Sequence, residues 1–331
     1  MAGEGATPDA APGPKAKRVY RRIDGFLLYD KPRGIGSNGA LQHVRWLYRA
    51  ERAGHTGTLD PLASGLLVIC FGQATRFAGE LLDAGKTYRA DLLLGIRTGT
   101  GDAEGEVIAQ KPVDCGLADI EAALARFRGD ILQTPPMHSA LKRDGVPLYR
   151  LARKGVEVPR EPRKVTIYDI RLESVNLPEI RIRVSCSKGT YIRVLAEDIG
   201  EVLGCGAHLS RLERLSLGPF RLEDAVSEET LVSLSEQERI ARLRPADELA
   251  FACPPLVIDG RSAAKFLQGQ AIATVAREKA EFRIYDEGGR FLGTGESGGT
   301  GMLQPRRVMV PEIPGPEVRN PAPKTGNQGS I

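Results

Sequence analysis

The chain has 331 residues, which is enough for two domains of the usual size of about 100 to 200 residues. Hydrophobic residues make up 41% and charged residues 27%, a composition that excludes a disordered chain, a collagen and a disulfide scaffold. The formal net charge of +4 only weakly favours an anionic partner.

The cysteines and the apolar runs indicate where the protein works. The cysteine count is odd and no C-x-x-C pair occurs, so we expect reduced thiols, no metal site and a cytoplasmic location. The N-terminus lacks the apolar core of a signal peptide, and the run 66–71 is far shorter than the roughly 18 residues of a membrane span. We therefore expect neither a signal peptide nor a membrane segment.

Apolar periodicity predicts the first elements of the fold. Residues 25–30 are expected to form a strand, and Ser37 is expected to cap the helix that follows. Residues 65–72 then predict a buried strand, residues 73–84 a helix, and residues 86–95 another strand.

The next elements continue the mixed pattern. A helix is expected near residues 117–127, a hairpin over 165–175 and 179–187, and a helix from Thr190 to about Val202. Mixed strands and helices of this kind favour an α+β fold, with a mainly antiparallel mixed sheet flanked by helices.

Composition also predicts the domain boundaries. Residues 1–22 and 312–331 are poor in core-forming residues and are expected to be disordered tails. One domain is expected over 23–250, and a small β-rich domain over 254–311, where glycines 288–289 join two short strands.

Two clusters of basic residues are candidate phosphate contacts. They lie over residues 15–22 and 142–164, where Lys and Arg outnumber Asp and Glu. Taken alone, each cluster is more typical of an ordinary solvated surface.

The most informative stretch is RAGHTGTLDPLASGLL, residues 52–67. It has the composition of a loop, yet it places the carboxylate of Asp60 directly before an apolar strand, and loops on a rigid scaffold often carry reactive groups. Taken alone, Asp60 and Pro61 are also compatible with a simple turn.

Five blocks in chain order, spanning about residues 24 to 218, resemble the TruB pseudouridine synthase family. They are GFLLYDKPRGIGSN (25–38), RAGHTGTLDPLASG (52–65), DAGKTYRADLLLG (83–95), SCSKGTYIRVLAEDIG (185–200) and GCGAHLSRLERL (204–215). The resemblance implies the pseudouridine synthase fold and an isomerase that converts uridine to pseudouridine in the T-loop of tRNA, at tRNA position 55. It also implies base flipping, an essential aspartate and no cofactor.

The resemblance implies three catalytic residues. Asp60 matches the essential carboxylate, which acts either as a nucleophile at C1′ or in forming a glycal, and the sequence leaves both paths open. Arg193 matches the arginine that pairs with this carboxylate. Tyr88 matches a tyrosine that stacks on the target base and is a candidate proton carrier. Its position in an alternating strand is also compatible with an ordinary aromatic residue of the core.

Four further residues are implied to bind the substrate. His55 matches a histidine that enters the space vacated by the flipped base. Tyr191 and Leu212 match residues that line the base pocket, although ordinary packing would also explain both. Lys31, in the first of the five blocks, completes the implied set.

The resemblance extends to contacts with RNA outside the pocket. Residues 131–160 resemble an RNA-gripping insertion and include much of the second basic cluster. Residues 254–311 resemble a PUA domain, a small β-barrel that grips the acceptor end of the RNA. We therefore expect tRNA as the partner, bound through its T-arm and acceptor end, and a monomer with no obligatory protein partner.

Three alternatives have different consequences. An RNA-guided pseudouridylase subunit would depend on partner proteins, but the insertion and the lack of long Lys-rich tails argue against it. A non-catalytic RNA-folding protein is disfavoured by the intact catalytic residues, although a folding role beside catalysis stays open. A methyltransferase is weakest, since no nucleotide-cofactor loop is present.

Overall fold

The computed structural model describes residues 20–139, 141–143, 145–276 and 278–310. The chain divides into two compact units between Ala252 and Cys253, and each unit is described by itself. The predicted tail 312–331 and residues 1–19 of the predicted N-terminal tail lie outside the described residues. Arg21 already belongs to the first unit, where its backbone N–H donates to the carbonyl of Arg49.

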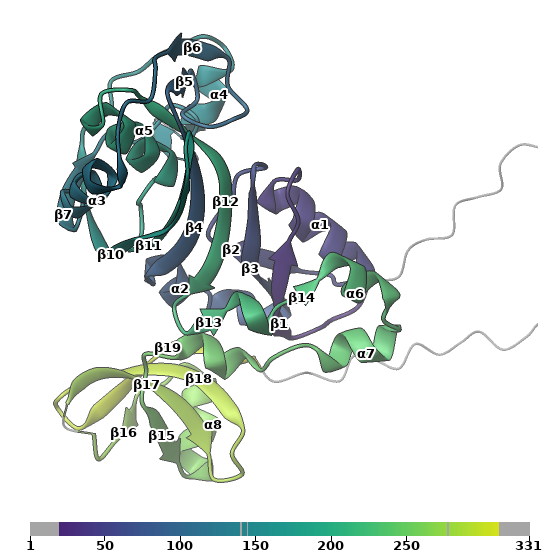
Figure 1. The fold of residues 1–331 in the computed structure, drawn as a ribbon. Coiled ribbons are helices and arrows are strands. Elements are labelled where there is room, and N and C mark those ends of the chain that lie inside the picture. The colour runs from purple at the N-terminus through teal and green to yellow at the C-terminus, as the bar shows by residue number, and fades with distance from the viewer. Residues whose placement is uncertain (1–19, 140, 144, 277, 311–331) are drawn as a thin grey trace, which may run out of the picture. The chain divides into compact units, whose positions relative to one another are not determined.

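The first unit is built on one ten-stranded sheet, with the strand order β14-β1-β3-β12-β4-β11-β10-β7 (Figure 1). Neighbouring strands on this path are antiparallel except β1 with β14 and β12 with β3. The strands are β1 (Gly25–Lys31), β3 (Ala63–Phe71), β4 (Lys86–Leu94), β7 (Gly129–Gln133), β10 (Arg163–Asn176), β11 (Glu179–Cys186), β12 (Ala207–Leu217) and β14 (Val226–Ser227), with β2 (Ala53–Thr56) paired to β3 and β13 (Phe220–Arg221) paired to β12.

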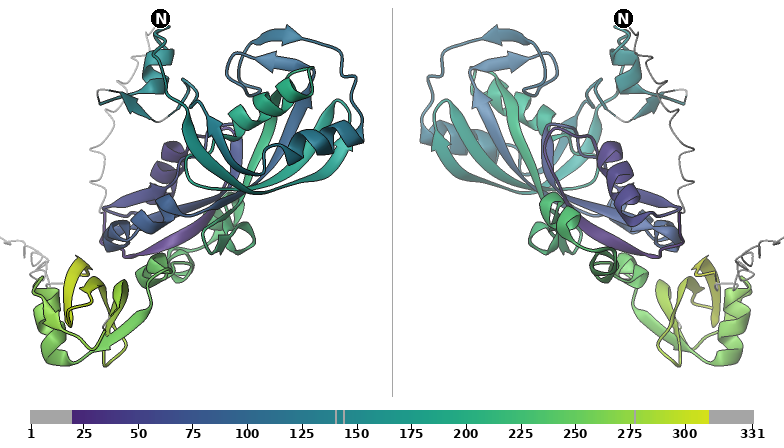
Figure 2. Two further views of the ribbon diagram at one scale, coloured as in Figure 1. Left: turned by 90° about the vertical axis from the view of Figure 1, so that its left-hand side faces the viewer. Right: turned by 90° about the vertical axis from the view of Figure 1, so that its right-hand side faces the viewer.

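Helices cover the two halves of this sheet with separate cores (Figure 2). Helix α1 (Ser37–Tyr48) packs its buried residues against β1 and β3. Helices α3 (Leu117–Ala125) and α5 (Ile192–Val202) pack against β4, β10, β11 and β12. The predicted α+β fold with a mainly antiparallel mixed sheet is confirmed.

The start of α1 differs from the prediction. Gly36 is the N-cap residue, with extended backbone, and Ser37 is the first residue of the helix. The Ser37 hydroxyl donates to the carbonyl of Leu59 at 2.9 Å and accepts from the Leu59 N–H at 2.6 Å. A side chain engaged in this way ties the helix to the loop ahead of β3 instead of capping the helix.

The single helix predicted over residues 73–84 is wrong, because the segment forms a 3₁₀ helix η1 (Gly72–Arg76) and a short helix α2 (Gly79–Asp83). Gly79 lowers the helix propensity between them. Phe77 and Leu81 are both buried, so the chain turns to place both side chains in the core.

Further elements of the first unit connect the strands. They are β5 (Ile96–Thr98), β6 (Val107–Gln110), β8 (Lys142–Arg143), β9 (Val146–Pro147), α4 (Leu148–Ala152), η2 (Leu222–Asp224), α6 (Glu228–Ser233), α7 (Glu236–Ala241) and η3 (Ala246–Ala250). In the described part of the chain, none of the helices has the length and apolar character needed to cross a membrane.

The second unit is a five-stranded sheet in the order β15-β17-β18-β19-β16, and it forms a half-barrel. The predicted hairpin is confirmed, since β17 and β18 pair antiparallel. The elements are β15 (Pro255–Ile258), α8 (Gly260–Leu267), β16 (Ile272–Ala273), β17 (Lys279–Asp286), β18 (Phe291–Gly298) and β19 (Met302–Val308).

Candidate active site

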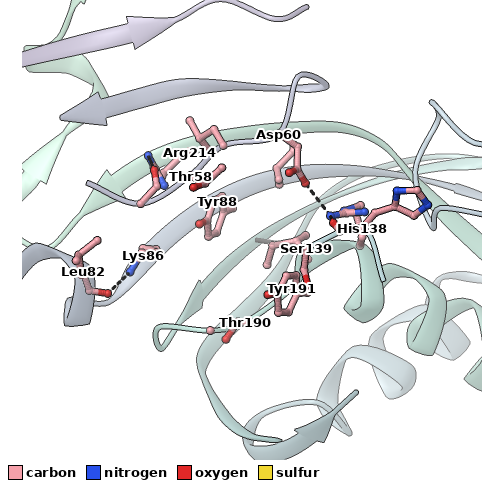
Figure 3. A pocket seen from close by; sticks show the side chains of 16 residues that line it. Thr58, Asp60, Leu82, Lys86, Tyr88, His138, Ser139, Thr190, Tyr191 and Arg214 are labelled. Carbon is pink, nitrogen blue, oxygen red and sulfur yellow. Dashed lines mark hydrogen bonds and ion pairs between the residues drawn. The ribbon is translucent and has the colours of Figure 1, made fainter. Parts of the chain in front are cut away.

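A cavity of about 260 Å³ opens where β4, β12 and the start of α5 meet the loop between β2 and β3 (Figure 3). Its wall combines carboxylate, cation and phenol groups from segments far apart in the sequence. These groups include Asp60, Tyr88, Tyr191, Arg193 and Arg214.

Backbone contacts hold the loop that carries Asp60. The Asp60 carbonyl accepts from the N–H of Ala63, and the carbonyl of Pro61 accepts from the N–H of Gly34. Together with the bonds between Ser37 and Leu59, these contacts fix the loop at both sides of Asp60. The Asp60 side chain is 43% exposed, so its carboxylate is fixed in place yet open to a ligand.

Arg193 lies in the first turn of α5 and links the cavity wall together. Its Nη2 lies 3.0 Å from Asp60 Oδ2 and donates to the carbonyl of His138 at 2.7 Å. Its Nε lies 3.5 Å from Asp102 Oδ2, and the side chain is only 7% exposed. A buried guanidinium with these partners holds the Asp60 carboxylate in one orientation.

Asp102 was not predicted as a site residue. It is buried, and its Oδ1 accepts from the hydroxyl of Thr100 at 2.5 Å and from the N–H of Glu104 at 3.1 Å. The residues around it have the composition of a turn, so the sequence offered no signal beyond a loop carboxylate. The structure shows that Asp102 is the second anion on Arg193.

Tyr88 is placed on the cavity wall together with a residue that was not predicted. Arg214 is the cross-strand partner of Tyr88 in the pairing of β12 with β4, and its side chain is fully buried. Its Nε donates to the carbonyl of Leu66 at 2.7 Å and its Nη2 to that of Gly57 at 3.2 Å. Burial raises the pKa of the Tyr88 phenol, and the Arg214 charge opposes this shift. The only sequence signal for Arg214 was a basic residue at an inward-facing position of a predicted strand.

His55 lies on β2, where it pairs with Ile69 of β3, and it is not part of the cavity wall. Its Nδ1 is buried and has no hydrogen-bond partner among the described residues. Burial, with a smaller effect of Arg214, lowers the pKa of the imidazole. The ring is therefore neutral at pH 7.

Tyr191 and Leu212 both line the cavity, as their predicted roles require. Tyr191 is the N-cap residue of α5, and its N–H donates to Gln133 Oε1 at 3.0 Å. Gln133 Nε2 in turn donates to the Tyr191 carbonyl at 3.3 Å, so β7 positions this residue. Leu212 is buried on β12, so packing and base contact both remain compatible with its place.

Lys31 does not line the cavity in the structure. It is fully buried, and its Nζ donates to the carbonyl of Ile35 at 2.6 Å and to that of Pro32 at 2.8 Å. Burial and the charge of Arg214 lower the pKa of Lys31 to about 8. Its visible contacts support the loop after β1.

The predicted insertion 131–160 begins inside the sheet, because β7 runs to Gln133, and then forms β8, β9 and α4. A second cavity of about 460 Å³ lies here and is lined by Lys142, Arg143 and Arg160 among others. The Arg160 Nε is buried without a hydrogen-bond partner in the described part of the chain. Arg160 also pairs with Glu157 at 3.1 Å, whereas no ion pair to Lys142 or Arg143 is seen within the described residues.

Comparison with solved structures shows the fold. The chain superposes on a chain of a crystal structure of a Cbf5-Nop10-Gar1 complex with a TM-score of 0.68 and 25% sequence identity, over 89% of this chain and 91% of the other.

Family models cover nearly all of the two units. The model described as TruB family pseudouridylate synthase (N terminal domain) matches residues 45–192, and that described as tRNA pseudouridylate synthase B C-terminal domain matches 193–249. A third, described as Pseudouridine synthase II TruB, C-terminal, matches 254–309. These matches place the chain in the class of pseudouridine synthases.

Curated relatives narrow the class further. The chain is 51% identical over 304 residues to tRNA pseudouridine synthase B of Burkholderia mallei, covering 90% of this chain and 97% of the relative. It is 53% identical over 294 residues to the enzyme of the same name from Methylobacillus flagellatus, covering 88% and 97%. The chain belongs to the TruB family of pseudouridylate synthases, and the predicted resemblance and enzyme class are confirmed.

Proposed function

We propose that this protein converts one uridine of tRNA to pseudouridine, in the T-loop at tRNA position 55. The observation that carries the proposal is the Asp60 carboxylate, held by the buried Arg193 in a cavity that also contains Tyr88. Relatives with more than 50% identity over about nine tenths of this chain are named for tRNA.

The reaction requires a carboxylate at the ribose. The N1–C1′ bond of uridine breaks, the uracil turns within the cavity, and C5 forms a new bond to C1′. Asp60 acts at the ribose, either by bonding to C1′ or by assisting formation of a glycal, and Arg193 keeps its carboxylate oriented. The product is an isomer of the substrate, so the overall reaction consumes no redox or group-transfer cofactor.

The size of the cavity supports a mechanism with base flipping. About 260 Å³ suits one nucleoside better than a folded RNA loop, and we propose that the uridine leaves its stack to enter it. We assign His55 to the vacated space, because a neutral ring replaces a base at lower desolvation cost than a cation would. Tyr88, Tyr191 and Leu212 would enclose the flipped base.

The basic cavity of the insertion would bind the RNA backbone. Lys142, Arg143 and Arg160 supply charges for phosphates of the T-arm. Residues 254–311 would contact the acceptor end as a PUA-like domain. We further propose a cytoplasmic monomer that needs no protein partner, which separates this chain from a guided enzyme.

The test is to incubate the purified protein alone with an unmodified tRNA transcript and to map pseudouridine at each position. The matched control is the same transcript with cytidine in place of the T-loop uridine. Conversion of that single uridine, and none in the control, is the expected result. No conversion without added proteins or guide RNA would refute the proposal and favour a guided subunit.

A further inference from the structure

Arg214 is the fully buried cation of the cavity wall that the proposed steps leave unused. Two of its three nitrogens are committed, since Nε and Nη2 donate to the carbonyls of Leu66 and Gly57. Its Nη1 is buried and has no partner within hydrogen-bond distance among the described residues, and Tyr88 is the side chain that interacts with the guanidinium. A buried donor held this loosely is costly, so the pair of Arg214 and Tyr88 calls for a functional explanation.

Strand register places this donor beside Tyr88. Arg214 and Tyr88 are directly opposed Cα partners of the β12 and β4 pair, so their side chains leave the same face of the sheet. Figure 3 shows the Arg214 guanidinium in the same part of the cavity as the Tyr88 phenol, with Thr58 beside them. The other ionisable groups that act on the phenol are Asp60 from the loop and Cys186 from β11.

The reaction leaves a proton to be moved. When C5 has bonded to C1′, C5 still carries its hydrogen, and the electron pair left by the broken N1–C1′ bond makes N1 a proton acceptor with a double bond to C6. Pseudouridine carries a proton on N1 and none on C5. Asp60 is bound to Arg193 at the ribose end, so a different group is needed to transfer this proton.

We propose that Arg214 is a positioning residue that stabilises Tyr88 as a transient phenolate during this transfer, an inference that rests on the proposed function. Tyr88 gives its hydroxyl proton to N1, and the phenolate then removes the proton from C5. The C5–H electron pair forms the C5–C6 double bond, and the C6–N1 double bond returns its pair to N1. N1 and C5 flank C6 on one edge of uracil, so one hydroxyl serves both atoms, and Tyr88 ends as it began.

The fixed guanidinium suits this role because its other donors are already held. Two backbone carbonyls fix its plane, so Nη1 keeps its place while the charge on the phenol changes. The Arg214 charge opposes the effect of burial on the pKa of Tyr88, as a phenolate-stabilising cation should. A lysine has the charge but not the planar fork.

The test measures the C5 step directly. Single-turnover conversion is compared on transcripts with uridine or 5-deuteriouridine at the target, for wild type, Arg214→Lys, Arg214→Gln, Tyr88→Phe and the Arg214→Lys/Tyr88→Phe double variant. We expect the deuterium isotope effect to grow from wild type to Lys to Gln, with the rate falling at least about tenfold for Gln. In the Tyr88→Phe background, Arg214→Lys should slow the reaction no further.

The outcomes separate this inference from the proposed function. Conversion by wild type tests the function whatever the variants do. An unchanged isotope effect in folded Arg214 variants, or equal slowing by Arg214→Lys with and without the Tyr88 hydroxyl, would overturn the inference and leave Arg214 a structural role. If the Arg214→Lys variant does not fold, Arg214→Gln still offers a donor to a backbone carbonyl and keeps the test open. Arg211 is exposed on the same strand, and Arg211→Lys is the control expected to behave as wild type.

Discussion

The two cavities of the first unit both contain basic side chains, but these side chains differ in burial and in ion pairing. In the active-site cavity, Arg193 is buried and shared between Asp60 and Asp102. In the cavity of the insertion, Lys142 and Arg143 are exposed and no ion pair to either is seen within the described residues. Paired buried charges fix a geometry, whereas exposed unpaired charges offer attraction. Chemistry and affinity should therefore respond to different substitutions.

The largest effect in this comparison is expected for Arg193→Lys. A lysine keeps the charge but cannot contact Asp60, Asp102 and the carbonyl of His138 together. We expect kcat to fall about 100-fold with little change in tRNA affinity. Single-turnover rates and filter binding on one transcript measure both quantities, and a loss confined to affinity would mean that the two cavities are not separate in function.

A smaller and opposite effect is expected in the insertion. Replacing Lys142 and Arg143 with glutamine should weaken tRNA binding by about tenfold at physiological salt, because two phosphate contacts are lost, and leave the rate at saturation unchanged. Binding measured over a range of salt concentrations should show a slope of the logarithm of the binding constant against the logarithm of salt concentration that is reduced by about 1.4 to 1.8. An unchanged slope would show that these cations face water instead of phosphate.

Gln133 extends the comparison to a neutral residue, because it lies on β7 and holds the backbone of Tyr191 at the active-site cavity by two hydrogen bonds. Gln133→Leu removes both hydrogen bonds to the backbone of Tyr191 and leaves those groups without this partner. We expect the free energy of unfolding to fall by about 1 to 3 kcal/mol and kcat to fall several-fold, with affinity retained. Chemical denaturation and steady-state kinetics measure both quantities, and unchanged stability and kcat would show that these two hydrogen bonds do not position Tyr191.

The smallest expected effect is a pH dependence of stability from His55. Its folded-state pKa is lowered by burial, so the unfolded chain binds more protons as pH falls below about 6.5. Stability should therefore fall with pH from about 6.5 down to the lowered pKa. His55→Gln should remove this part of the dependence, which urea unfolding at pH 7.5 and 5.5 would reveal. Equal pH dependence in both proteins would place the effect elsewhere.

The fold was largely predictable because most of its elements have clear periodicity. Strand β11 alternates buried and exposed residues, and α1 places its apolar residues on one face, so local pattern and tertiary packing agree. The helix predicted over 73–84 failed because the core requires a turn there, which propensity alone does not show. The prediction that Ser37 caps α1 was wrong for a similar reason, since its hydroxyl forms hydrogen bonds with Leu59, which is distant in the sequence.

The site was predictable only where a residue lies within a recognisable block. Asp60, Tyr88 and Arg193 were selected from three separate blocks, and the structure brings all three to one cavity. Asp102 and Gln133 escaped because their importance comes from long-range partners that no local pattern reveals. Arg214 lies inside a quoted block, yet only the register of β12 with β4 places it opposite Tyr88.

The most direct test of the account is Asp60→Asn, which keeps the size of the side chain and removes its charge. Single-turnover conversion and equilibrium binding should be measured on the same unmodified tRNA transcript for this variant and for wild type. We expect no detectable pseudouridine and an affinity within about threefold of wild type, because phosphate contacts outside the cavity supply most of the binding. Retained conversion, or binding lost together with it, would contradict the role of Asp60 as the reacting carboxylate.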